Sequence, residues 1–245
     1  MSKIIDKAIK SEEVHNVIFS DFLDPYQKKM VADAFSSVKE VNHTFNGGYS
    51  GAEREIVLFC PEGMSIEDFS NFKYPFKILN IKIKARSSLT HRDFLGALMS
   101  LGIKREKIGD ILVKEDTGTI VVLGDMADYI KCNLAQVGDA SVDVEVREAE
   151  NIEAPESKVK EITTTVASLR LDSISSAGFG ISRSKIVEFI RAEKVSLNWE
   201  PTGSLTKLVK EGDVISIKGK GRVVVDKIGG TTKKGRIGIT LKKLV

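Results

Sequence analysis

The sequence predicts an α+β protein built from two or three small domains, and three observations lead to this prediction. The length of 245 residues is more than one typical domain needs. Stretches with the 3.6-residue periodicity of amphipathic helices alternate with stretches that repeat every two residues, as strands do. A polar stretch with neither periodicity contains Pro155 and predicts a linker at 151–165. We therefore expect domains at 1–73, 74–150 and 166–245.

The first domain carries both helix and strand signals. Helical patterns cover residues 13–22 and 25–35, and the second helix has Asp24 as its expected N-cap and proline at its first position. Strand patterns follow at 41–45 and 56–60. Together these four segments predict a small N-terminal α+β unit.

A glycine-rich stretch, N-G-G-Y-S-G-A-E-R at 46–54, separates the two predicted strands. Its glycines permit a tight or left-handed turn. A phosphate-cradling loop is a sharper interpretation, but the G-x-x-x-x-G-K-[ST] pattern of such loops is absent. We therefore expect a turn here, with Tyr49 and Arg54 as candidate RNA contacts.

The second domain shows the order strand, helix, strand, strand, helix, strand. The four expected strands lie at 79–83, 111–113, 119–123 and 142–146. Thr90 and Asp93 predict a capping box at the start of the first helix, and the second helix is expected over 127–137. E-D-T-G at 115–118 predicts the hairpin turn. This order predicts a ferredoxin-like, split-βαβ domain, the architecture of RNA-recognition motifs.

This RRM-like domain lacks the aromatic residues on which RNA-recognition motifs stack bases. Its third strand contains T-I-V-V-L at 119–123, with no Phe or Tyr. Two interpretations therefore stay open: the domain binds RNA through basic residues, or it only mediates other contacts. The basic residues concerned are Arg92, Lys104, Arg105 and Lys107.

The net charge of +3 hides an uneven distribution. From Glu156 onward there are 18 Lys and Arg against 9 Asp and Glu, whereas the preceding residues contain 19 against 25. A basic surplus confined to one part of a chain indicates an anionic partner there. The alternative is a solvated basic face that binds no partner.

The basic part contains short motifs in a fixed order. They are L-R-L-D at 169–172, G-F-G-I-S-R-S-K at 178–185, I-R at 190–191, V-S-L-N-W at 195–199 and V-K-E-G-D-V-I-S-I at 209–217. They predict two short helices followed by a small platform of strands and turns. Ser182 is the expected N-cap of the second helix, and Ile186, Val187 and Ile190 would anchor that helix to a core.

This order of motifs closely resembles the S4 (alpha-L) RNA-binding domain, named after a ribosomal small-subunit protein. S-R-S, V-x-L-N and G-D-V-I-S-I occur in the family's order over some 50 residues. Two residues depart from the family pattern, because Lys194 and Trp199 stand where the family usually has glycine. Trp199 is either a packed aromatic residue or a platform for base stacking.

The candidate RNA-binding residues follow from the motifs and their charge. Those expected to grip phosphates at the second helix are Ser182, Arg183, Ser184, Lys185 and Arg191. Those expected to extend the surface are Lys194, Asn198, Lys207, Lys218, Lys220 and Arg222. Glycine-spaced basic turns at 218–222 and 233–236 would let the backbone approach phosphates, and such contacts position a protein without selecting sequence.

The sequence gives little support for an enzymatic function. R-L-D followed by serines also resembles the catalytic aspartate loop of pseudouridine synthases, but the S4 family has R-L-D at the same place. Asp172 is therefore expected to pair with Arg170 at a helix start. The three histidines are isolated, and no Walker, G-x-S-x-G or methyltransferase loop occurs. We expect no catalytic residue, no metal and no cofactor.

The cysteines and the hydropathy pattern bear on location. Cys60 and Cys132 lie far apart, each within an apolar pattern, which predicts buried thiols in a reducing cytosol and offers too few ligands for zinc. No apolar run approaches the roughly 20 residues that span a bilayer, and the N-terminus lacks a signal-peptide core. We therefore expect a cytoplasmic protein with no membrane contact.

The domain order resembles one family over nearly the whole chain. F-L-D-P at 22–25, G-G-Y-S-G-A-E-R at 47–54, the stretch 89–111 and the S4 motifs are similar to the YlmH-type RNA-binding proteins of Gram-positive bacteria. The resemblance implies a non-enzymatic factor, expected to be monomeric, that binds rRNA and tRNA on the large ribosomal subunit in ribosome-associated quality control. Two alternatives stay open: an RNA-modifying enzyme targeted by its S4 domain, and a cell-division-associated RNA-binding factor.

Overall fold

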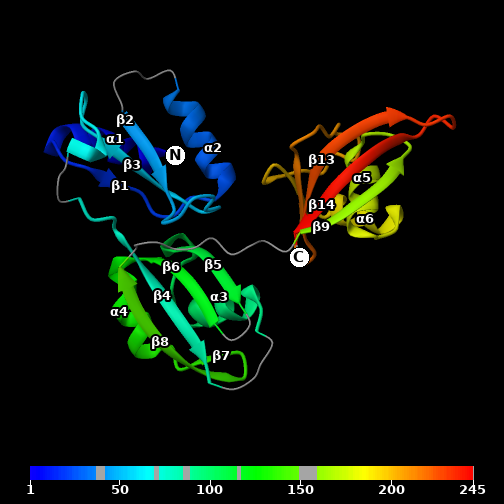
Figure 1. Cartoon of the computed structure of the whole chain (residues 1–245). Coiled ribbons are helices and arrows are strands. Elements are labelled where there is room, and N and C mark those ends of the chain that lie inside the picture. Colours follow the sequence, from blue (N-terminus) through cyan, green and yellow to red (C-terminus); the bar gives the residue numbers. More distant parts are fainter. Residues whose placement is uncertain (37–41, 69–71, 85–88, 115–116, 149–158, 245) are drawn as a thin grey trace. The chain divides into compact units, whose positions relative to one another are not determined.

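The protein forms two compact units of mixed helix and sheet. The structure, a computed structural model, describes residues 1–36, 42–68, 72–84, 89–114, 117–148 and 159–244. Contacts divide the chain into Met1–Pro155 and Glu156–Val245, each shown in Figure 1. Both units contain helices packed on antiparallel strands, so the predicted α+β class is confirmed.

The N-terminal part of the first unit is a small sheet covered by two helices. Its elements are α1 (Ser2–Val14), β1 (Ile18–Phe19), α2 (Pro25–Phe35), β2 (Asn42–Asn46), β3 (Ile56–Cys60) and the 3-10 turn η1 (Ile66–Asp68). The strand order is β1-β3-β2, all antiparallel. Val57 and Phe59 of β3 share a core with α1 and α2, whereas Ile56 and Leu58 pack on the opposite side. Burial on both faces explains why β3 is continuously apolar.

The predicted helix at 25–35 is confirmed, and the helix predicted at 13–22 is wrong. Asp24 and Gln27 form the capping box of α2, with the Gln27 N–H donating to Asp24 Oδ1 at 2.8 Å. The first helix instead ends at Val14, and His15 turns the chain with φ 49° and ψ 48°. The next residues form β1, because pairing with the buried strand β3 outweighs the local helical pattern.

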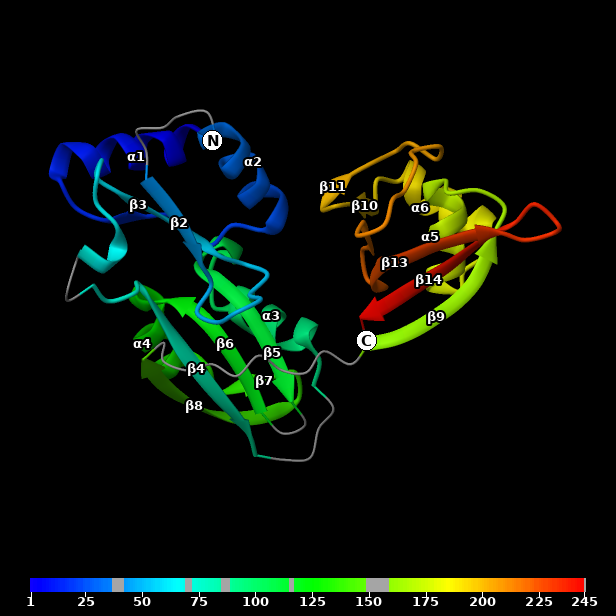
Figure 2. The same cartoon turned by 45° about the horizontal axis from the view of Figure 1, so that its top comes forward.

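The second part of this unit has the predicted split-βαβ order. Its elements are β4 (Phe76–Ile83), α3 (His91–Ser100), the 3-10 turn η2 (Arg105–Lys107), β5 (Ile108–Lys114), β6 (Thr117–Leu123), α4 (Gly124–Asn133), β7 (Gln136–Val137) and β8 (Ala140–Glu148). The strand order is β5-β6-β4-β8-β7, again antiparallel throughout. Figure 2 shows the long strands β4, β6 and β8 side by side.

Local sequence signals predict the start of α3 and the presence of α4, the two helices that pack on this sheet. Thr90 and Asp93 form the predicted capping box of α3. The second helix, α4, ends at Asn133 and is therefore shorter than predicted, although Leu134 and Val137 still pack in the same core. The first two positions of the turn expected at 115–118 lie outside the described residues.

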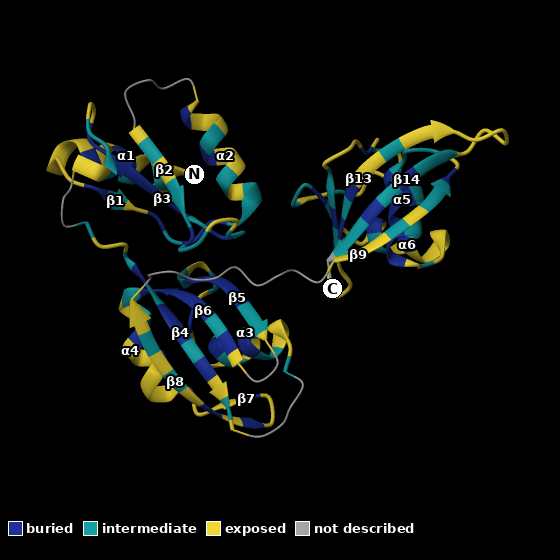
Figure 3. Ribbon diagram, in the orientation of Figure 1, coloured by how far each residue is buried: buried dark blue, intermediate teal, exposed yellow. Residues whose placement is uncertain are grey.

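The face of this sheet that lies away from α3 and α4 is divided in two. Near one end, Phe76, Val121 and Leu123 pack against β3 and Phe22 in a shared core. Farther along, Asn80 and Thr119 pair across β4 and β6 with only partial burial. Figure 3 shows the buried stretch of β6 giving way to more exposed positions. No aromatic residue of β6 is available for stacking, as the sequence predicted.

The second unit is a six-stranded sheet with two helices on one face. Its elements are β9 (Val159–Val166), α5 (Leu171–Phe179), α6 (Arg183–Arg191), β10 (Val195–Leu197), β11 (Glu200–Pro201), β12 (Val214–Ile217), β13 (Gly221–Thr231) and β14 (Ile237–Leu244). The strand order is β11-β10-β12-β13-β14-β9. Ile174, Ile186, Ile190 and Val195 belong to its single core cluster.

The structure differs from the linker expected at 151–165. Val159–Val166 forms strand β9, which pairs with β14 along its whole length. The alternation in V-K-E-I-T-T-T-V is that of a strand, but its exposed face is polar and its partner lies about 80 residues away, so the segment resembles a linker locally. The remaining linker positions, 151–158, lie outside the described residues.

The two cysteines have different surroundings. Cys60 is buried in β3, and burial raises the pKa of its thiol. Cys132 is exposed, because α4 turns Ala127 and Ile130 inward and leaves position 132 on its outer side. The prediction of two buried thiols is therefore wrong for Cys132. Among the described residues, no helix is both long and apolar enough to cross a membrane.

Candidate nucleic-acid interface

Helix α6 is anchored on one side and open at its start. Ile186 and Ile190 are fully buried, as predicted, and Val187 is partly buried. Ser182 occupies the N-cap position, but its hydroxyl lies 3.2 Å from Ser184 Oγ and does not cap the backbone. Within the described part of the chain, the N–H groups of residues 183–185 therefore have no hydrogen-bond acceptor. Such a helix start binds anions.

A buried carboxylate lies between two arginines beside this helix start. Asp172 is 2% exposed. It accepts hydrogen bonds from Arg183 Nε at 2.9 Å and Arg170 Nε at 3.2 Å. The predicted pairing with Arg170 is confirmed, but Asp172 is the second residue of α5 rather than its cap. Two cations around one carboxylate leave an excess positive charge at a fixed position.

A second basic group lies where α6 ends and the sheet begins. Arg191 is the last residue of α6, and the Lys218 N–H donates to the carbonyl of Lys194 at 3.0 Å. Lys220 follows in the turn between β12 and β13. These four side chains are exposed and have no ion-pair partner within the described residues. Arg222 is the second residue of the next strand, β13, and is partly buried.

Lys185 and Lys207 lie near the first turns of helices α6 and α5, respectively. Lys185 is exposed in the first turn of α6. The carbonyl of Lys207 accepts the N–H of Leu171 at 2.9 Å, which places Lys207 next to the start of α5. Its ammonium lies 3.2 Å from Glu200 Oε2 in a partly exposed ion pair. Apart from Asn198 and Arg222, the predicted residues thus form two groups at opposite ends of a nine-residue helix, about 13 Å apart at 1.5 Å per residue.

Asn198 has a structural role that the sequence did not reveal. Its Oδ1 accepts the N–H of Val214 at 2.9 Å, and its Nδ2 donates to Asp213 at 2.9 Å. Asn198 and Trp199 both have positive φ, at 51° and 65°, so they form the two-residue turn between β10 and β11. Trp199 is partly buried, and its Nε1 is shielded from solvent, which favours the packed interpretation.

Replacing Asn198 by alanine is expected to destabilise the second unit by about 2 kcal/mol, because the Val214 N–H and Asp213 would each lose a partner. The affinity for RNA, measured well below the unfolding transition, should change less than about twofold, since the side chain is already engaged. Urea denaturation and filter binding on the same preparation would measure both. A large loss of affinity with unchanged stability would show instead that Asn198 contacts RNA.

Two of the four basic candidates in the RRM-like domain serve the fold. The Arg105 guanidinium donates to the carbonyls of Ile108 and Gly109 at 2.6 and 3.1 Å, and burial lowers its pKa to about 10. Lys107 lies 2.8 Å from Asp21 Oδ1. Arg92 and Lys104 are exposed, so they alone keep the character expected of RNA contacts.

The glycine-rich loop turns Tyr49 and Arg54 inward, contrary to their expected role as RNA contacts. Asp110 of β5 accepts hydrogen bonds from the Tyr49 hydroxyl at 2.6 Å and from the Glu53 and Arg54 N–H groups at 2.7 and 3.0 Å. The buried Arg54 guanidinium donates to the carbonyls of Ile108 and Phe22 at 3.0 and 2.9 Å. We call this set of contacts the Asp110 clamp. It joins the two parts of the first unit.

Three domain families match the chain in order. Residues 1–63 match the family described as "YlmH, N-terminal", residues 70–151 match "Putative RNA-binding domain in YlmH", and residues 169–215 match "S4 domain". The matched stretches contain the β2–β3 loop, the split-βαβ sheet and helix α6 with Lys185, Arg191 and Lys194, whereas Lys218 and Lys220 follow the end of the S4 match. The separate matches agree with the resemblance that the motifs indicated.

Individual proteins are also similar to this chain. The ribosome-associated protein quality control protein P2 of Bacillus subtilis is 33% identical over 244 residues, covering 98% of this chain and 93% of that protein. A solved structure of the cell division protein ylmH from Streptococcus pneumoniae is 24% identical, with a TM-score of 0.49, and covers 62% of this chain and 92% of its own. With three matching domains in this order and a relative alike over nearly the whole chain, the protein belongs to the YlmH family of S4-domain proteins.

Proposed function

We propose that this protein is a non-enzymatic RNA-binding factor that acts on the ribosome in the cytoplasm. It would contact rRNA and tRNA on the large subunit, as a monomer, in the quality control of stalled peptidyl-tRNA complexes. Family membership and the name of the Bacillus subtilis relative support the ribosomal setting. The observation that carries the proposal is the pair of basic groups at the two ends of α6.

Both groups suit phosphate rather than base recognition. The start of α6 presents backbone N–H groups and the exposed ammonium of Lys185. Its end presents Arg191 and Lys194 beside Lys218, with no carboxylate paired to them among the described residues. Isolated lysines on a structured surface position a protein on a folded RNA and select little sequence. We therefore expect recognition of RNA shape.

The same geometry bears on the enzyme alternative. Both oxygens of Asp172 are engaged by Arg170 and Arg183, and the carboxylate is almost fully buried. A catalytic carboxylate must reach its substrate. The observed contacts instead suit a residue that orients two arginines, which supports a binding role for this region.

The proposal is tested by the salt dependence of binding. With about five phosphates neutralised, the affinity for isolated large ribosomal subunits should fall on the order of a hundredfold or more between about 50 and about 200 mM salt. Co-sedimentation over a salt series would measure the change, and subunits that carry peptidyl-tRNA should retain more protein than empty ones. Crosslinking and sequencing of the bound RNA would identify the contacts. An affinity that does not respond to salt would contradict the proposal.

A further inference from the structure

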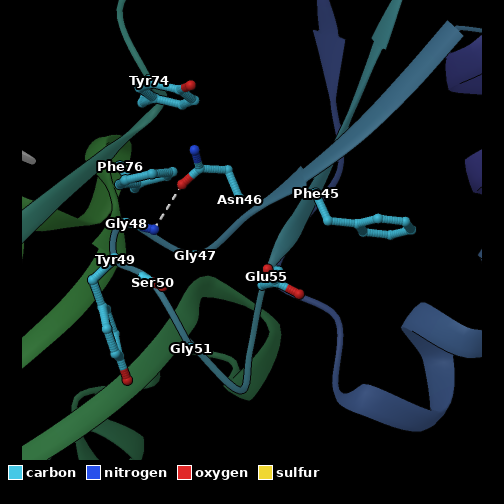
Figure 4. A pocket seen from close by; sticks show the side chains of 10 residues that line it. All are labelled: Phe45, Asn46, Gly47, Gly48, Tyr49, Ser50, Gly51, Glu55, Tyr74 and Phe76. Atoms are coloured by element: carbon cyan, nitrogen blue, oxygen red, sulfur yellow. Dashed lines mark hydrogen bonds between the residues drawn. The ribbon is translucent and has the colours of Figure 1, made fainter. Parts of the chain in front are cut away.

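A cavity of about 400 Å³ opens beside the glycine-rich loop of the first unit, far in sequence from the S4 domain. Its wall is formed by the end of β2, the loop that follows, and the start of β4. Figure 4 shows the residues that line it: Phe45, Asn46, Gly47, Gly48, Tyr49, Ser50, Gly51, Glu55, Tyr74 and Phe76. The volume lies within the range of about 300 to 1,000 Å³ found for small-molecule sites.

One side of the cavity is aromatic. The rings of Tyr74 and Phe76 are stacked, with centroids 5.4 Å apart and planes 28° from parallel. Phe72 meets Tyr74 edge-on at 5.4 Å, which braces the tyrosine ring from another direction. Tyr74 nevertheless remains 37% exposed. It also lines a second cavity of about 240 Å³.

The other side of the cavity offers hydrogen-bond donors. Asn46 Oδ1 accepts the Gly48 N–H at 2.8 Å, which fixes the amide and leaves Nδ2 as a donor with no acceptor in the described part of the chain. Figure 4 shows this nitrogen turned away from Gly48. The N–H groups of residues 49–51 likewise have no acceptor among the described residues. These donors suit the carbonyl or ring-nitrogen edge of a flat ligand.

The loop that carries these donors is held in place from behind. A Cβ at Gly47 would lie 2.4 Å from the Ala52 side chain, so only glycine fits there. The Asp110 clamp ties Tyr49 and the backbone of residues 53–54 to β5. The cavity is therefore preformed, and binding would need little ordering of the chain.

We propose that this cavity binds a nucleobase, which would stack on Tyr74 and present its edge to Asn46 Nδ2 and the loop N–H groups. Glu55 lines the cavity and is ion-paired with Lys28, and no lysine or arginine is among the described lining residues, so the cavity offers no excess positive charge to a phosphate and suits the base instead. Guanine and uracil suit the donors best, because they carry a carbonyl oxygen, O6 or O4, at the position where adenine and cytosine carry an amino group. The base could come from a free nucleotide or from an unpaired position of RNA; only the second source rests on the proposed function.

The test uses the full chain with GMP, UMP, AMP and CMP, and with single-stranded pentanucleotides of the same bases. Saturation-transfer NMR should show transfer to base protons, strongest for GMP or UMP. Tyr74→Ala should weaken binding about tenfold or more, because stacking on one aromatic ring changes affinity about 5- to 150-fold. Tyr74→Phe keeps the ring and should bind within about twofold of the parent. Asn46→Asp keeps the acceptor for Gly48 but removes the donor, and should weaken binding about fivefold.

The arms of the experiment separate the two sources. A pentanucleotide that binds at least about tenfold more tightly than its mononucleotide assigns the site to RNA, and equal affinities assign it to a free nucleotide. Both results support a nucleobase site. Absence of transfer from every nucleotide, or equal binding by the Tyr74→Ala and parent proteins, would overturn it. A variant neutralised around α6 should keep the mononucleotide signal, so failure of the proposed function would remain distinguishable.

Discussion

Replacing Lys185, Arg191 and Lys194 together by glutamine is expected to weaken binding to the large ribosomal subunit on the order of a hundredfold at about 0.1 M salt. Each ammonium or guanidinium that contacts a phosphate releases condensed cations, so three fewer contacts should also flatten the salt dependence. The slope of log affinity against log salt should decrease in magnitude by about 2 to 3. Co-sedimentation at four or more salt concentrations would measure both quantities.

Arg183 is left unchanged in this variant for a structural reason. Its guanidinium pairs with the buried Asp172 at 2.7 Å, and its removal would leave that carboxylate with Arg170 alone. Loss of one partner from a buried charge is costly to stability, so reduced binding could not be attributed to RNA contacts. The three chosen side chains are exposed and have no ion-pair partner among the described residues.

A control with the same change in charge is available in the first unit. Lys3, Lys10 and Lys29 are exposed and likewise have no ion-pair partner among the described residues. Their replacement by glutamine lowers the net charge equally, but the affinity should change less than about threefold, because long-range attraction alone is lost. Equal losses in the two variants would show that net charge, rather than the surface around α6, governs binding.

Local signals in the sequence located most of the elements whose own residue pattern favours the conformation that they adopt in the fold. Asp24 with Pro25 marked the start of α2, and Thr90 with Asp93 marked the start of α3, because capping depends on residues within one turn. The apolar run at 56–60 indicated a strand, and the structure shows that β3 is buried on both faces. These features need no knowledge of the rest of the chain.

Elements that depend on distant partners were misjudged. The local pattern predicts helix at β1 and linker at β9, whereas both segments are strands, because each acquires its conformation by pairing with a strand far away in sequence. The apolar pattern predicts a longer α4 for a related reason, since Leu134 and Val137 reach the core from beyond the helix end. In each case tertiary pairing or packing outweighs the local periodicity.

The candidate site likewise has features that the local sequence predicts and features that depend on residues far away in sequence. The sequence indicated where positive charge gathers, and the structure places these residues around both ends of α6. It could not indicate which charges are already engaged, because Glu200 beside Lys207 and the carbonyls beside Arg105 are neighbours only in space. The inward turn of Tyr49 and Arg54 was hidden for the same reason: Asp110 lies more than 50 residues away.

Replacing Arg54 by methionine is expected to destabilise the first unit by about 3 kcal/mol, because buried carbonyl groups would lose their donor. Arg54 is 9% exposed and donates to Ile108 and Phe22, which belong to different parts of the unit. Methionine can fill much of the space but donates no hydrogen bond. Urea denaturation followed by far-UV circular dichroism would measure the change.

The chain supplies its own reference for this experiment. Its single tryptophan, Trp199, lies in the second unit, so its fluorescence follows that unit while the circular dichroism follows both. In the Arg54→Met variant, the midpoint of the fluorescence transition should remain at the same urea concentration as in the parent. The midpoint of the transition of the first unit should move to a lower urea concentration. Arg92→Met, at an exposed position, should cost less than about 0.5 kcal/mol. An equally small cost at Arg54 would mean that water or rearranged backbone satisfies the carbonyls, and that the two parts are joined well enough by the apolar packing of Phe76 and Val121 against β3 and by the remaining bonds to Asp110.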